Sequence, residues 1–141
     1  MQAESIAPPR RRAPLLPVAA GLALALPFLL LFIKHPDGAF DLLALLLAFT
    51  GGIYYGAALN GGRRGRVVFE GLFAALLIGF GLLSLFWTPL WLALGFVLHG
   101  AWDLVHHTGG VQHGVRRWFP PLCAVWDWII AAMVVYFTLG G

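Results

Sequence analysis

The chain alternates between long apolar runs and short polar breaks. Each run is close to the roughly 20 residues that an α-helix needs to cross a bilayer. The breaks are rich in Pro, Gly, Asn and Arg, which are typical of turns and loops. This pattern predicts an all-α fold, a polytopic membrane helical bundle of five transmembrane helices. The predicted spans are residues 14–33, 40–59, 67–86, 89–107 and 120–139.

Composition places the chain in the membrane. Of its 141 residues, 60% are hydrophobic and 11% are charged, whereas a soluble domain has about 25% charged residues. We expect a disordered basic arm over residues 1–13 and a single transmembrane domain over residues 14–141. The net charge of +3 does not indicate a nucleic-acid partner, because the arginines sit in short clusters between apolar runs.

The basic residues also predict the orientation. Of the nine Lys and Arg residues, only Lys34 falls between the first and second spans. The arginines fall in the arm, in the loop between the second and third spans, and in the loop between the fourth and fifth. Cytoplasmic loops are enriched in Lys and Arg. This rule predicts a cytoplasmic N-terminus, an external C-terminus and, in a bacterium, residence in the inner membrane.

The fourth predicted span carries an unusual cluster of ionisable groups. Within nine residues it contains His99, Asp103, His106 and His107. At 100° per residue, all four fall on one helix face about 100° wide. His99 with Asp103, and Asp103 with His107, are i, i+4 pairs whose side chains can meet.

Imidazole and carboxylate are the usual ligands of zinc and iron. Ionisable side chains inside a membrane are costly and mark functional sites by default. We therefore interpret His99, Asp103, His106 and His107 as ligands of a divalent metal ion, zinc or iron. In the alternative interpretation, His106 and His107 simply favour the negative end of the helix dipole.

Depth in the membrane adds two further acids to this site. At 1.5 Å per residue, Asp103 lies about 7 Å, Glu70 about 5 Å and Asp127 about 9–10 Å from the cytoplasmic end of their spans. We expect Asp127 to be a further metal ligand or a catalytic acid–base group, and Glu70 to be catalytic. The alternatives are a pair between Glu70 and Arg66 and a hydrogen bond between Asp127 and a tryptophan.

The combination of these motifs resembles a family of small bacterial membrane proteins of unknown function, over about residues 40–135. It consists of His-Gly-Ala-Trp-Asp-Leu-Val-His-His at 99–107, Phe69-Glu70, and Pro-Leu-Cys-Ala-Val-Trp-Asp-Trp at 121–128. The chain is more loosely similar to membrane hydrolases such as alkaline ceramidases and lysoplasmalogenases, which use Asp, Ser and His around zinc. It departs from them in having fewer predicted spans, and in having Ser84 as its only serine within a span, at the outer end.

These observations predict a metal-dependent membrane enzyme, a hydrolase or an oxidoreductase, that acts on a lipid or another apolar substrate from the cytoplasmic leaflet. The alternatives are a transporter or conduit for protons or metal ions, and a non-catalytic assembly subunit. A haem protein ranks last, because intramembrane bis-His haem needs histidines on facing helices and every deep histidine here is on one span. Membrane lipid is the expected partner, and homo-oligomerisation stays open.

Overall fold

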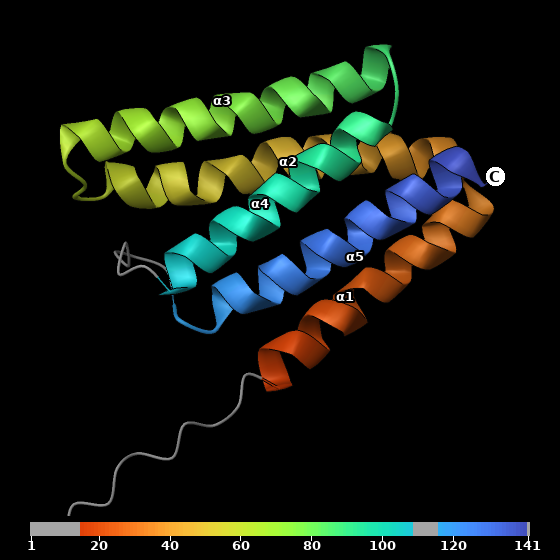
Figure 1. Ribbon diagram of the computed structural model, residues 1–141, viewed down its shortest axis with the longest axis horizontal. Helices are drawn as coiled ribbons and strands as arrows, with labels where there is room; N and C mark the ends of the chain where they lie inside the picture. Colours follow the sequence, from red (N-terminus) through yellow and green to blue (C-terminus); the bar gives the residue numbers. More distant parts are fainter. Residues whose placement is uncertain (1–14, 109–115, 141) are drawn as a thin grey trace, which may run out of the picture.

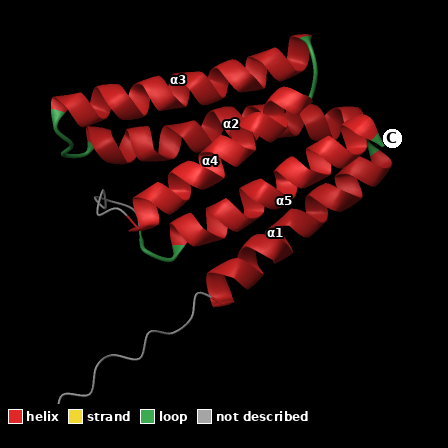
Figure 2. Cartoon of the chain, in the orientation of Figure 1, coloured by secondary structure: helices red, strands yellow, loops and turns green. Residues whose placement is uncertain are grey.

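A computed structural model describes residues 15–108 and 116–140 of the chain. In these two ranges the secondary structure consists of five α-helices, without a strand (Figure 2). The helices are α1 (Leu15–Lys34), α2 (Pro36–Leu59), α3 (Arg64–Phe86), α4 (Leu90–Thr108) and α5 (Phe119–Leu139). The all-α prediction is therefore confirmed, while the predicted basic arm lies outside the described residues.

Two helices begin at least three residues earlier than the apolar pattern predicts. α2 begins at Pro36 instead of residue 40, since a proline at the first helical position loses no helical hydrogen bond. α3 begins at Arg64 instead of residue 67, because arginine is a good helix former even where it is not apolar. Polar first turns thus extend both helices beyond their apolar stretches.

The helices run up and down, so that alternate ends meet (Figure 1). α2 and α3 form an antiparallel hairpin, and α4 crosses from this hairpin to α5, which also packs on α1. The first residues of α1, α3 and α5 therefore lie at the same end of the bundle as the last residues of α2 and α4. We call this the arginine end, because it carries Arg63, Arg64, Arg66, Arg116 and Arg117.

Small residues allow α2 and α3 to approach closely. A Cβ atom at Gly51 would lie 3.1 Å from the Cα of Ala74, and one at Gly81 would lie 3.0 Å from the carbonyl oxygen of Ala44. Small residues at such contacts are typical of membrane helices. The spacing of the α2–α3 hairpin therefore depends on glycine at these two positions.

The outside of the bundle is apolar, with large hydrophobic side chains exposed on all five helices. Four of the helices, α1, α2, α3 and α5, are long and apolar enough to cross a membrane. The fourth in sequence, α4, has 19 residues and contains the His and Asp cluster, which lowers its hydropathy. These features make the chain an integral membrane protein.

The buried interior divides into an apolar half and a polar half. Away from the arginine end, α2, α3, α4 and α5 contribute Leu43, Leu77, Phe96 and Ile130 to one hydrophobic cluster. Toward the arginine end, the same four helices bury tyrosine, glutamate, histidine and aspartate side chains. Among the described residues, the buried acids and histidines therefore all lie in one half of the bundle.

Candidate functional site

In the part of the chain that the structure describes, five acidic and histidine side chains are buried in the polar half, each with at most 4% of its surface exposed. They are Glu70, His99, Asp103, His106 and Asp127. The sequence predicted that acids from three helices would reach one layer, and the structure brings them into two adjacent clusters. Each cluster contains a histidine of α4 that contacts an acid from a neighbouring helix.

The first cluster, the Asp–His–Asp group, consists of His99, Asp103 and Asp127. The Nδ1 atom of His99 lies 2.7 Å from Oδ2 of Asp127 and 3.5 Å from Oδ2 of Asp103. One ligand atom from each residue lies within 4.8 Å of the other two. Two helices, α4 and α5, therefore present an imidazole and two carboxylates to a common point.

Tyr54 of α2 adds a hydrogen bond to this group. Its phenol donates to Oδ1 of Asp103 over 2.6 Å, and its side chain is buried. One oxygen of Asp103 is thereby occupied, while Oδ2 keeps no hydrogen-bond partner. A hydrogen bond of this kind fixes the orientation of a ligating carboxylate.

Gly100 allows α4 and α5 to approach at the level of the Asp–His–Asp group. A Cβ atom at Gly100 would lie 2.6 Å from Nε1 of Trp128 and 3.2 Å from the backbone oxygen of Ala124. Since His99 directly precedes Gly100, the same close approach brings His99 within hydrogen-bonding distance of Asp127. The glycine of the His-Gly-Ala-Trp-Asp motif thus has a packing role at the site.

Three buried polar atoms of the Asp–His–Asp group have no hydrogen-bond partner. They are Nε2 of His99, Oδ2 of Asp103 and Oδ1 of Asp127. Buried polar atoms in native proteins are nearly always hydrogen-bonded, and an exception requires a specific explanation such as an ion or a water molecule. Each member of this group therefore has capacity for one more interaction.

The second cluster is built around Glu70, and both of its carboxylate oxygens are occupied. Oε1 lies 2.9 Å from Nε2 of His106, and Oε2 accepts a hydrogen bond of 3.2 Å from Nε1 of Trp102. Arg66, one helical turn earlier, lies 3.9 Å from Oε1. The Arg66–Glu70 pair anticipated from the sequence is present, but Glu70 is buried and also holds two side chains of α4.

The hydrogen bonds of His106 determine how many protons the Glu70–His106 pair holds. Its Nδ1 lies 3.0 Å from the backbone oxygen of Trp102, and a carbonyl oxygen can only accept, so Nδ1 carries a hydrogen. The contact between Nε2 and Glu70 then requires a second hydrogen, on the ring or on the carboxyl group. In either arrangement the pair is electrically neutral, which lowers its cost in a membrane.

Tyr54 also connects the two clusters. Its ring lies 4.1 Å from that of His106 between centroids, while its hydroxyl group contacts Asp103. The side chain of Tyr54 therefore contacts both the Glu70–His106 pair and the Asp–His–Asp group.

The structure groups some of the predicted ligands and separates others. His99, Asp103 and Asp127 form the three-residue group, whereas His106 uses both ring nitrogens in hydrogen bonds outside it. His107, on the last turn of α4, is half-buried, and its Nδ1 has no hydrogen-bond partner. Asp127 pairs with a histidine and not with a tryptophan.

Sequence reasoning missed Tyr54. Helix rise, which located the acids, also locates this tyrosine, because Tyr54 lies six residues before Asn60 at the end of α2. That spacing corresponds to about 9 Å along the helix, the same layer as Asp103. A tyrosine is common near a membrane interface, so its residue type alone gave no signal.

The fold and site define a class: a helical membrane protein with a buried group of histidine and carboxylate side chains in one half of its bundle. Within that class, the chain belongs to a family of unknown function, DUF6010, whose family model matches residues 13–141. The resemblance to a family of unknown function is thereby confirmed. A search of curated proteins and a search of solved structures gave no match.

Proposed function

We propose that this protein is a membrane-embedded metalloenzyme whose divalent metal ion is bound by His99, Asp103 and Asp127. The observation that carries the proposal is the convergence of three buried ligand atoms within 4.8 Å of one another, each from a residue that retains an unpartnered polar atom. Histidine with carboxylate is a donor set that zinc and iron both accept.

Charge balance supports a cation at this position. Two carboxylates and one imidazole carry net negative charge whether His99 is neutral or protonated. Buried charge without compensation is strongly unfavourable. A divalent cation would compensate the carboxylates and could also bind the free oxygens of Asp103 and Asp127, whereas protonation of one aspartate would reduce the negative charge without binding these oxygens.

The distances indicate what must change when a metal binds. Two ligands of one tetrahedral zinc ion are about 3.3 Å apart, given metal–ligand distances of about 2.0–2.1 Å. The separation of 2.7 Å between His99 and Asp127 is that of a hydrogen bond. Metal binding therefore requires this hydrogen bond to open by about 0.6 Å and its proton to leave.

Three protein ligands leave a fourth position for water or substrate, as in catalytic zinc sites. His107 keeps a buried Nδ1 without a hydrogen-bond partner, but its ligand atoms are not among those that converge with His99, Asp103 and Asp127. Glu70 contacts His106 and Trp102 and is not a member of the Asp–His–Asp group. It fits a proton-holding role better than that of a ligand.

The apolar half of the bundle favours an enzyme over a transmembrane conduit. A path for ions requires polar or hydrated groups across the whole membrane. Here Leu43, Leu47, Phe96 and Ile130 are completely buried beyond the polar clusters. The position of the polar clusters toward the arginine end suits a reaction on a molecule that arrives from one leaflet, such as a lipid.

The proposal includes the topology. α4 spans the membrane with the other four helices, the N-terminus is cytoplasmic, and the membrane is the inner membrane of a bacterium. The support is the shared position of Arg63, Arg64, Arg66, Arg116 and Arg117 at one end of the bundle. The site then lies in the cytoplasmic half of the bilayer.

Elemental analysis of protein purified in mild detergent tests the metal. We expect about one equivalent of zinc or iron in the unaltered protein and a loss of it in His99→Ala. Asp41→Asn is the matched control, because Asp41 is an exposed acid of α2 near the opposite end. Absence of metal from the unaltered protein, even after incubation with zinc or iron(II), would overturn the proposal.

The enzymatic part needs its own test. Metal-loaded and chelator-treated protein would be incubated with bacterial lipid extract, and the products compared by mass spectrometry. We expect a lipid species to change only with the metal-loaded protein. Bound metal without any metal-dependent product would support a structural or assembly role instead.

A further inference from the structure

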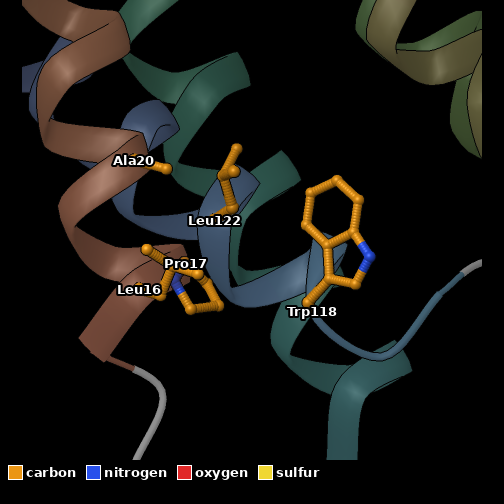
Figure 3. A pocket seen from close by; sticks show the side chains of 5 residues that line it. All are labelled: Leu16, Pro17, Ala20, Trp118 and Leu122. Carbon is orange, nitrogen blue, oxygen red and sulfur yellow. The ribbon is translucent and has the colours of Figure 1, made fainter.

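An apolar groove lies between α1 and α5 at the arginine end, outside the polar clusters. It encloses about 440 Å³ and is lined by Leu16, Pro17 and Ala20 of α1 and by Trp118 and Leu122 of α5. Figure 3 shows Leu16, Pro17 and Ala20 on α1 with Leu122 of α5 beside them, and Trp118 farther away at the start of α5. All five lining residues are apolar apart from the indole nitrogen of Trp118.

This groove is separate from the proposed metal site. On α5, Leu122 and Asp127 are five residues apart, which places them about 140° apart around the helix. Leu122 faces α1, whereas Asp127 faces α4 and contacts His99. A ligand in the groove is therefore separated from the Asp–His–Asp group by the body of α5.

Two cationic residues adjoin the groove in sequence. Arg116 and Arg117 are exposed and directly precede Trp118, which lines it. A tryptophan beside arginines is typical of the interface between acyl chains and headgroups. Basic residues next to an intramembrane groove on the cytoplasmic side are suited to anionic lipid headgroups.

We propose that this groove binds one anionic phospholipid. An acyl chain lies along Leu16, Ala20 and Leu122, and the phosphate of the headgroup lies at Arg116 and Arg117. The apolar lining of the groove favours an acyl chain, and the positive charges of Arg116 and Arg117 favour a negative headgroup. The proposal depends on the membrane location of the chain and not on the metal site.

Native mass spectrometry of the full chain, titrated with phosphatidylglycerol or with phosphatidylcholine of the same acyl chains, provides the test. We expect one phosphatidylglycerol to bind more tightly than phosphatidylcholine. Each arginine near a membrane surface contributes about a fivefold factor in affinity. Arg116→Gln with Arg117→Gln should therefore weaken phosphatidylglycerol binding about 30-fold and leave phosphatidylcholine binding unchanged.

The chain offers a control for each half of the site. Arg63→Gln with Arg64→Gln removes two exposed arginines at the same end, on the α2–α3 hairpin, and should leave the affinity unchanged. Ala20→Phe fills the groove and should abolish binding of the acyl chain. Ala19→Phe adds the same bulk to an exposed neighbouring position and should have no effect.

Three results would overturn the proposal. Equal weakening by the two arginine pairs would show a general attraction of anionic lipid to the basic surface. Equal affinity for both lipids in the unaltered protein would remove the headgroup site. Unchanged phosphatidylglycerol binding in Ala20→Phe would show that the lipid does not occupy the groove.

Discussion

The phenol oxygen of Tyr54 lies 2.6 Å from Oδ1 of Asp103, a contact that joins α2 to α4 across 49 residues of sequence. It leaves Oδ2 as the atom of Asp103 that is available to a metal. Tyr54→Phe keeps the ring against His106 but frees the carboxylate to rotate. Loss of such a supporting hydrogen bond typically lowers metal affinity 10–100-fold, which a competition titration with a chelator would measure.

Tyr55→Phe is the natural control for this substitution. Tyr55 is the next residue, and 36% of its surface is exposed. Removal of the hydroxyl group in Tyr55→Phe should leave the metal affinity unchanged. If Tyr54→Phe lowers the melting temperature equally with and without metal, while affinity stays the same, the tyrosine only supports the fold.

The role of Asp127 can be separated into charge and shape. Asp127→Asn keeps an acceptor oxygen for His99 but removes the negative charge. We expect it to fold and to lose the metal. Asp127→Ala should also destabilise the protein by about 1–3 kcal/mol, because His99 is left buried without its partner. Normal metal content in the Asn variant would remove Asp127 from the ligand set.

The close approach at Gly100 predicts a packing defect that reaches the site. Gly100→Ala should push α4 away from α5 and cost about 1–3 kcal/mol, with a loss of metal affinity because His99 moves with the backbone. Gly79→Ala is the control, since a Cβ there meets no atom within 4 Å. It should gain up to about 1 kcal/mol from helix propensity. Unfolding in mild detergent and metal titration would compare the two, and equal stabilisation would contradict the packing role.

The hydrogen bonds of Glu70 and His106 predict that glutamine can replace Glu70 without loss of structure. In Glu70→Gln the amide oxygen can accept from Trp102, and the amide nitrogen can donate to Nε2 of a neutral His106. We expect this variant to retain its stability and metal, whereas Glu70→Ala should lose about 1–3 kcal/mol for each partner left buried and unpaired. Loss of turnover in the Gln variant alone would assign a catalytic proton transfer to Glu70. Large destabilisation of the Gln variant would contradict the hydrogen-bond assignment.

The orientation is tested with fusions at Gly141. A phosphatase that is active only outside the cytoplasm should be active there, and a fluorescent protein that matures only in the cytoplasm should be dark. The opposite pair of results would invert the topology and place the polar half of the bundle in the outer leaflet.

The sequence predicted the elements of this fold better than their partners. Apolar runs of membrane length located all five helices, and helix rise alone placed Glu70, Asp103 and Asp127 in one layer. Which acid contacts which histidine depends on how each helix is rotated about its axis and how closely it packs. The depth of a residue in the membrane determines neither of these. The sequence therefore grouped His106 with the ligands, although it contacts Glu70, and it missed Tyr54, whose hydroxyl group becomes informative only beside Asp103.

The polar face of α4 also has a consequence for how the protein is made. An aspartate in a membrane helix costs up to about 3 kcal/mol on insertion, the full amount applying at the helix centre, and the histidines add to this cost. α4 is accordingly the helix of the five that hydropathy alone does not identify as a span. If α4 spans the membrane as proposed, we expect its insertion to be coupled to that of α5 and to docking on the α2–α3 hairpin, because Asp127, Tyr54 and Glu70 are the partners of its polar side chains. In that case, substitutions at the proposed site are expected to impair membrane insertion of the chain as well as its chemistry.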